Sequence, residues 1–225
     1  LESGSNDPIA FTLTCIFLAL IKGEQISIGT VLFFQIFWGI LIGVIVAYVI
    51  RKFMEYTDLQ KSGLITVFIF AVVLLSFSIS ELLNGNGYLT VYILGLILGN
   101  QVFIAKKEVI FFFDGVSNIM NILLFFILGL LATPAHILAN LFFAIVIAVV
   151  LIFIVRPIVV FGLMLPFDLK LNQKWLVSWG GLRGAAAIAF AIMVVNQYKT
   201  SSVDIFHIVF GVCLLSSLIQ GSSMK

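Results

Sequence analysis

Residues 1–8, with the sequence LESGSNDP, place two carboxylates, a carboxamide and two hydroxyls at the start of an apolar segment that continues to residue 21. Two local structures fit this stretch. In the first, Pro8 lies inside a helix, and its ring and missing N–H leave the carbonyl of Gly4 without a helical partner. In the second, the helix begins after the polar turn, with Asp7 as its N-cap and Pro8 as its first residue. The stretch itself leaves both open.

The first structure would make the polar turn a binding site. Spacing by four residues puts Ser3 over Asp7 and Glu2 over Asn6 on a helix. A carboxylate, a hydroxyl and a freed carbonyl then converge on one small volume, which suits a monovalent cation or a proton. Ionisable residues inside a membrane are commonly functional, so Asp7 is a candidate site residue.

The composition indicates an integral membrane protein, because 62% of the 225 residues are hydrophobic and only 10% are charged. We expect an all-α bundle of eight membrane crossings. Apolar runs of sufficient length occupy residues 1–21, 26–50, 63–83, 88–105, 109–135, 137–165, 175–195 and 203–220. No link between them is long enough for a separate domain, so residues 1–225 form one partial transmembrane domain.

The basic residues follow the positive-inside rule. With eight crossings, one side of the membrane holds eight of the twelve basic residues, and the other side holds Lys22 and Lys199. The remaining two, Arg156 and Arg183, lie inside apolar segments. We therefore expect both ends of the chain to be cytoplasmic, in the inner membrane of a cell.

Several classes of function are disfavoured. The formal charge of +2, with sparse and scattered Lys and Arg, does not indicate nucleic-acid binding. Cys15 and Cys213 lie in separate apolar runs and suggest neither a disulfide nor a metal site. His136 and His207 stand alone near segment ends, without a partner at metal spacing. The chain has no initiator Met and no signal peptide, so we interpret it as a fragment.

Two arginines inside the apolar segments are candidate functional residues. A guanidinium keeps its charge when buried, so Arg156 requires either a carboxylate partner or access to the cytoplasmic surface. Arg183 lies in WGGLRGA, residues 179–185, whose glycines weaken a helix and permit close packing. Broken helices of this kind mark transporter sites, although a close-packed seam also fits.

Two further glycine patterns predict structural features. Residues 84–87, NGNG, predict a tight turn on the outer side of the membrane. Gly95 and Gly99 predict a seam of small residues where another helix packs.

The chain resembles the monovalent cation:proton antiporter family, and within it the bacterial potassium/proton antiporters of the cell-volume-regulation type. The resemblance covers nearly the whole chain. It rests on residues 1–8, GNGYLTVY at 85–92, residues 95–100, FDG at 113–115, LGL at 128–130, RP at 156–157 and WGGLRGA at 179–185. The chain departs from the family pattern at Gly181-Leu182, where variants have Pro before the Arg, and at Ala186-Ala187, where relatives often have Val-Pro.

The resemblance implies a fold of about thirteen helices in two inverted repeats, with a core and a dimerisation domain, so that the protein is a homodimer and this chain begins in the sixth helix. It implies that Asp7 carries the ion and the proton, with Asn6 as its neutral neighbour and Ser3 as a ligand. Glu2 and Arg156 would form a structural ion pair. Residues Gly180, Gly181, Arg183 and Gly184 would form the broken, gating helix.

The expected function is secondary active antiport of K⁺, or alternatively Na⁺, for H⁺, with one carboxylate alternating between the two ions and no cofactor. Because Asn6 does not titrate, the resemblance implies electroneutral exchange. An intramembrane enzyme is disfavoured, because neither Ser3 nor Cys15 has a nearby His as a base. A channel is also disfavoured, because a single carboxylate in a broken helix does not make a ring-lined pore.

Overall fold

The computed structural model describes residues 2–25, 27–57, 63–165, 170–181, 185–197 and 204–223, with only the backbone for residues 2–5 and residue 185. Within these ranges the chain is helical and has no strand, which confirms the predicted all-α class. Contacts divide the chain into two compact units, residues 1–119 and 120–225, with the boundary inside helix α5 (Lys106–Leu131).

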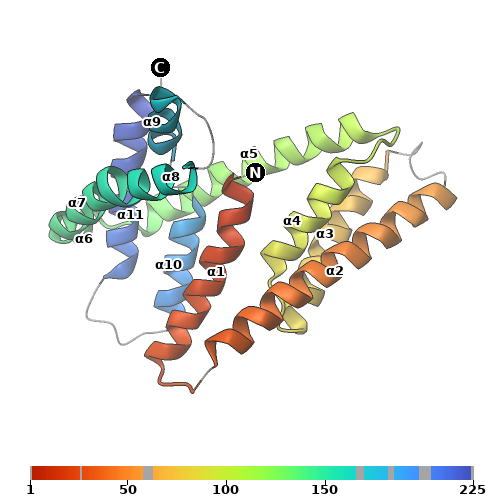
Figure 1. Cartoon of the computed structure of the whole chain (residues 1–225), viewed down its shortest axis with the longest axis horizontal. Coiled ribbons are helices and arrows are strands. Elements are labelled where there is room, and N and C mark those ends of the chain that lie inside the picture. The colour runs from red at the N-terminus through yellow and green to blue at the C-terminus, as the bar shows by residue number, and fades with distance from the viewer. Residues whose placement is uncertain are drawn as a thin grey trace. The chain divides into compact units, whose positions relative to one another are not determined.

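The first unit is built from apolar helices that end at short polar or glycine-containing turns. They are α1 (Glu2–Ile21), α2 (Ile28–Tyr56), α3 (Ile65–Leu82), α4 (Gly87–Gly99) and the first part of α5. Figure 1 shows α2, α3 and α4 side by side. Their core includes Ala47, Ile65 and Leu94, which have no exposed surface. Helix α2 extends beyond its predicted end at residue 50, and an ion pair of 3.1 Å between Arg51 and Glu55 supports the added turns.

Two glycines of α2, rather than the predicted pair on α4, allow helices to approach closely. A Cβ at Gly43 would lie 2.9 Å from the carbonyl oxygen of Thr90 on α4, and one at Gly39 would also be crowded. The predicted seam at Gly95 and Gly99 is wrong for the described part of the chain, because a Cβ at either residue would meet nothing within 4 Å. Both pairs have the same spacing, so spacing alone does not identify the pair that meets a partner.

The second unit contains shorter helices. They are α6 (Pro134–Ala139), α7 (Leu141–Val149), the π-helix η2 (Val150–Val155), α8 (Arg156–Leu163), α9 (Leu171–Trp179), α10 (Ala185–Gln197), α11 (Ile205–Ser216) and the π-helix η3 (Ser217–Gly221). Helix α11 packs against both α7 and α10. The predicted segment 175–195 is two helices, since α9 ends at Trp179 and α10 begins at Ala185. The interruption falls within the glycine-rich motif, as expected.

The helix from Leu141 to Leu163 is continuous but not uniform. Pro157, near the start of α8, has no N–H to donate to the preceding turn. The π-helical turn η2 immediately precedes it, and such turns accommodate local breaks in the α-helical hydrogen-bond pattern. Arg156 therefore follows directly after a locally widened helix.

The chain is a multi-pass membrane protein, as its composition predicts. Four helices are long and apolar enough to cross a membrane, namely Ile28–Tyr56, Ile65–Leu82, Lys106–Leu131 and Leu141–Leu163. Shorter apolar helices cover Asn6–Ile21, Gly87–Gly99, Ala186–Gln197 and Ile205–Gly221. These helices match the eight predicted segments in order. Eight crossings remain a prediction, because a straight helix needs about 20 residues to span the hydrocarbon core.

Candidate functional site

The polar turn is part of helix α1. The helix begins at Glu2 and contains Pro8, so the alternative in which Asp7 caps a helix that starts at Pro8 is wrong. Asn6 is exposed, Asp7 is partly buried and Pro8 is buried. The carboxylate of Asp7 therefore lies beside a proline inside a helix, as the first of the two predicted structures requires.

The other predicted members of this site are placed by the backbone alone. Residues 2–5 are helical, so Ser3 lies one turn before Asp7 and Glu2 lies one turn before Asn6. The side chains of Glu2 and Ser3 lie outside the described part of the structure. Their convergence with Asp7 therefore stays a prediction.

The carbonyl of Pro8 is bound by a residue that the sequence analysis treated only as part of a turn. The side-chain amide of Asn86 donates to the Pro8 carbonyl at 2.7 Å and to the Thr12 hydroxyl at 2.9 Å. The Thr12 hydroxyl lies 3.0 Å from the Pro8 carbonyl and 2.5 Å from Oε1 of Gln35. A hydroxyl has one proton, so Thr12 donates to one of these acceptors at a time.

Asn86 also fixes the start of α4. Its Oδ1 accepts from the backbone N–H of Leu89 at 3.0 Å as the N-cap of the helix. Its own N–H donates to the Gln35 carbonyl at 3.1 Å, and only 2% of its surface is exposed. The predicted tight turn is present, with Asn84 at a φ of 57°, but residues 85–87 are buried. Asn86 thus joins α4 to α1 through its side chain and to α2 through its backbone N–H, next to Asp7.

We predict that Asn86→Ala lowers the free energy of unfolding by about 2 kcal/mol or more. The variant loses an N-cap, which is worth about 0.5–2 kcal/mol, and leaves buried polar atoms on α1 without their donor. The measurement is the thermal midpoint of the full-length protein in detergent. Asn100→Ala is the control, because Asn100 is exposed and its side-chain amide donates to the Leu96 carbonyl of the helix that it ends, at 2.8 Å. Equal shifts for the two variants would contradict this anchoring.

A cavity of about 480 Å³ lies between α1, α2 and the turn that joins α3 to α4. Its wall includes Glu81, whose carboxylate accepts from the Gly87 N–H at 2.9 Å. Phe11 also lines the cavity. Since Phe11 follows Asp7 by one helical turn, the cavity reaches α1 close to the polar turn.

In the second unit, Arg156 lies against the glycine-rich motif. Its guanidinium occupies the position where a Cβ of residue 181 would be, so only glycine leaves room for it. Gly181 is buried, whereas Gly180, the C-cap of α9, is exposed. The break between α9 and α10 therefore provides the space that Arg156 occupies.

The remaining predictions for these arginines lie outside the described residues. Arg183 and Gly184 fall in the interval between α9 and α10 that the structure does not describe. The ion pair between Glu2 and Arg156 also stays a prediction, because the side chain of Glu2 is not described.

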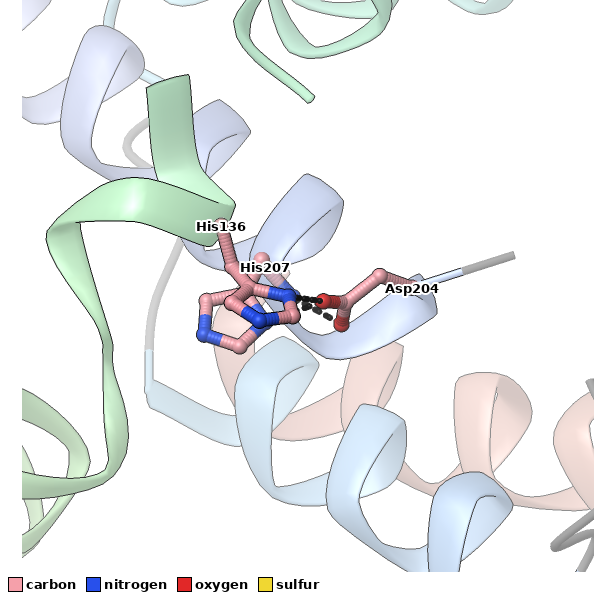
Figure 2. A group of neighbouring side chains, drawn as sticks. All are labelled: His136, Asp204 and His207. Carbon is pink, nitrogen blue, oxygen red and sulfur yellow. Dashed lines mark hydrogen bonds and ion pairs between the residues drawn. The ribbon is translucent and has the colours of Figure 1, made fainter. Parts of the chain in front are cut away.

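The interpretation of His136 and His207 as isolated histidines is wrong. Figure 2 shows both imidazoles facing the carboxylate of Asp204. Oδ2 of Asp204 lies 2.9 Å from Nδ1 of His136 and 2.6 Å from Nδ1 of His207. The two rings stack with centroids 5.1 Å apart and an interplanar angle of 29°. The residues come from links that are far apart in the sequence. Strict alternation of the predicted crossings places those links on the same side of the membrane, and this was the one feature of the sequence that could have indicated the cluster.

Asp204 is held as the N-cap of α11, where its Oδ1 accepts from the backbone N–H of His207 at 3.3 Å. Partial burial alone would raise the pKa of the Asp204 carboxyl, but the contacts with His207 and His136 outweigh it and lower the pKa below its usual value. The contact of 2.6 Å with His207 Nδ1 is an ion-pair distance without the alignment of a hydrogen bond. Asp204 is therefore ionised at neutral pH.

Comparison with known proteins identifies the class to which this helical membrane protein belongs. All of residues 1–225 match the family described as sodium/hydrogen exchanger, transmembrane. The chain therefore belongs to the sodium/hydrogen exchanger family. This confirms the predicted resemblance to monovalent cation:proton antiporters.

Curated relatives cover the chain but are longer. It is 31% identical over 230 residues to the K(+)/H(+) antiporter NhaP2 of Shewanella sp. strain ANA-3, and 30% identical over 240 residues to the K(+)/H(+) antiporter NhaP of Alkalimonas amylolytica. Each match covers 100% of this chain and 40% of the relative. The Na(+)/H(+) antiporter NhaG of Bacillus atrophaeus is 28% identical over 197 residues, which is 83% of this chain and 36% of that protein. The chain thus spans about 40% of the length of these relatives.

Proposed function

We propose that the protein to which this chain belongs exchanges a monovalent cation for H⁺ across the membrane, with K⁺ as the preferred cation and Na⁺ as the alternative. The observation that carries the proposal is Asp7, a partly buried carboxylate beside Pro8 inside α1. Family membership supports it, as do relatives named for K⁺/H⁺ and Na⁺/H⁺ antiport. Such exchange is transport without covalent chemistry, so the protein is not an enzyme and needs no cofactor.

Asp7 binds either the proton or the cation in this mechanism. The proline break leaves the Gly4 carbonyl without its helical donor, so that carbonyl and Ser3 complete the oxygen ligands of the cation. Asn6 is neutral, so the site holds one negative charge that either ion balances. One cation then moves for one proton, and exchange is electroneutral.

Arg156 and the glycine-rich break form the supporting part of the mechanism. Contact of the Arg156 guanidinium with Gly181 supports this proposal, because it holds the end of α9 close to the start of α8. Glu2 balances the charge of Arg156 in the complete protein. Gly180, Arg183 and Gly184 give the interrupted helix the freedom to change position as the site alternates.

The proposed topology has eight crossings of an inverted-repeat fold, with both ends of the chain on the cytoplasmic side of the inner membrane. The distribution of basic residues supports this orientation. The contact between His136 and Asp204 supports the crossing count, because it requires their two links to lie on the same side. The complete protein is a homodimer in this proposal.

Competition at one carboxylate predicts a specific pH dependence. Acid keeps the proton on Asp7 and prevents cation binding, whereas alkali lets the cation saturate the site, so exchange should have an optimum. Raising the cation concentration should move the acidic limb to lower pH, because the cation binds only the ionised carboxylate and so favours proton release. The measurement is exchange by the full-length protein in inverted vesicles from acid to alkaline pH, at low and high K⁺ and then Na⁺.

The cation that moves the acidic limb at the lower concentration is the preferred substrate. Choline at equal ionic strength is the control for salt effects, since it should leave the limb in place. An acidic limb that does not move with either K⁺ or Na⁺ would exclude single-site competition and indicate a separate pH sensor.

A further inference from the structure

A second group of polar side chains lies outside the polar turn of α1. One ligand atom from each of His136, Asp204 and His207 lies within 4.8 Å of the others. Both imidazoles approach the same carboxylate oxygen, at 2.9 and 2.6 Å (Figure 2). We propose that these three residues bind a divalent transition-metal ion of the zinc type. The proposal concerns binding and does not depend on the proposed transport function.

The arrangement offers three donor atoms to one cation. The imidazole rings of His136 and His207 stack 5.1 Å apart, and both approach the same carboxylate oxygen of Asp204. The Nδ1 atom of His207 is buried, and its close contact with Asp204 is not aligned as a hydrogen bond. A dication bound by both Nδ1 atoms and Oδ2 would give each of the three groups a partner and would balance the negative charge of the carboxylate.

The set of donor atoms determines the class of metal. Two imidazole nitrogens and one carboxylate oxygen match the three-ligand sites in which Zn²⁺ keeps a position for water. Ca²⁺ and Mg²⁺ prefer oxygen ligands throughout, and Cu²⁺ and Ni²⁺ also accept imidazole. With bonds of about 2.0–2.2 Å, two ligands of a tetrahedral Zn²⁺ lie about 3.3 Å apart. The present contacts of 2.9 and 2.6 Å would therefore need to open by less than 1 Å.

Groups that would orient the ligands are already in place. Oδ1 of Asp204 accepts from the backbone N–H of His207, which leaves Oδ2 toward the imidazoles. Nε2 of His207 lies 3.2 Å from both the N–H and the hydroxyl of Thr133. The backbone N–H donates to Nε2 only in the tautomer that carries the ring proton on Nδ1. When Nδ1 binds metal, Nε2 carries the proton and the Thr133 hydroxyl can accept from it. An acceptor for the second ring nitrogen of a ligating histidine is typical of metal sites.

The group is also accessible from one side. The side chain of His136 is 64% exposed, whereas that of His207 is 11% exposed. A metal ion can thus enter beside His136 and retain a water ligand there. Because His136 belongs to α6 and His207 to α11, a bound metal would join two helices that are far apart in the sequence.

The test measures zinc binding by the purified full-length protein after treatment with EDTA. Equilibrium dialysis against ZnCl₂ gives the stoichiometry and affinity, and the melting temperature is recorded with Zn²⁺ and with Mg²⁺. The variants are His136→Gln, Asp204→Asn and His207→Gln. Glu55→Gln is the matched control, because it removes an exposed carboxylate that pairs with Arg51 in the other unit.

We expect each of the three variants to weaken zinc binding at one site by at least about 10-fold. Replacing a residue that only supports a metal ligand already costs about this much, so removing a ligand should cost no less. The control variant should bind as the unmodified protein does, and Zn²⁺ but not Mg²⁺ should raise the melting temperature. If Asp204→Asn or His207→Gln does not fold, His136→Gln tests the proposal by itself. The side chain of His136 is exposed, so this variant should fold. Unchanged zinc binding in His136→Gln, or equal stabilisation by Zn²⁺ and Mg²⁺, would overturn the proposal.

Discussion

Asp7→Asn is expected to reduce cation/proton exchange to background while the protein still folds and inserts into the membrane. Asn has nearly the shape of Asp but can neither release a proton nor balance a cation. Asp7 is partly buried beside Pro8 in α1, and its neighbour Asn6 is neutral and cannot replace the lost charge. The measurement is the pH change driven by K⁺ or Na⁺ in inverted vesicles that contain the full-length protein.

Protein levels in the vesicles must be matched, because a loss of exchange is informative only at equal abundance. Glu24→Gln is a suitable control, since it removes an exposed carboxylate just beyond the end of the same helix. It should leave exchange unchanged. Exchange retained by Asp7→Asn would reject Asp7 as the carrier, and with it the proposed site.

The second large effect concerns Arg156 and Gly181. The proposed pair of Arg156 with Glu2 predicts that Arg156→Ala strongly lowers the stability of the full-length protein, because removal of one partner of a buried ion pair typically costs about 3–5 kcal/mol. Gly181→Ala should cost about 1–3 kcal/mol by overpacking, because its Cβ would overlap the guanidinium of Arg156. In the Arg156→Ala background, Gly181→Ala should cost little, because the overlapping group is gone. Melting temperatures of the four proteins measure this coupling.

Gly162→Ala is the matched control for the glycine substitution. Gly162 lies in the same helix as Arg156, and a Cβ there would meet nothing within 4 Å. It should be neutral or slightly stabilising, because alanine favours a helix more than glycine does. Additive losses for Arg156→Ala and Gly181→Ala would show that the contact does not matter. Separately, Glu2→Gln combined with Arg156→Gln should recover part of the loss if those two residues pair.

Much of the fold follows from the sequence because membrane helices are specified by local composition. The described helices match the predicted apolar segments in order, and the interruption between α9 and α10 falls in the predicted glycine-rich motif. The position of Pro8 could not be decided in this way. A sequence Asp-Pro fits both the start and the interior of a helix, and only the helical backbone from Glu2 onward distinguishes them.

The parts that were missed depend on contacts between distant segments. Asn86 was assigned to a turn, but its amide reaches the Pro8 carbonyl 78 residues earlier in the chain. The cluster of His136, Asp204 and His207 likewise joins links that are separated by 68 residues or more. Local sequence patterns and residue spacing do not predict such contacts between distant segments. The side of the membrane to which a link belongs is the one long-range constraint that the sequence supplied.

Because a π-helical turn precedes Arg156, the direction in which this charge points depends on the number of residues in that turn as well as on the residue type. Ala144, Ala148 and Ile152 are buried, and Arg156 follows at the same interval of four. In an α-helix each such interval turns by about 400°, so the row would drift by about 40° per step. The slower winding of a π-helix reverses that drift and brings Arg156 back toward the buried row.

Loss of a single residue between Val150 and Val155 would therefore rotate Arg156 by about 100° about the helix axis. The guanidinium would then point away from Gly181, although no residue of the contact had been replaced. In this segment an insertion or deletion is as consequential as substitution of the arginine itself, and aligned relatives should be compared by the length of this turn as well as by the residue at its end.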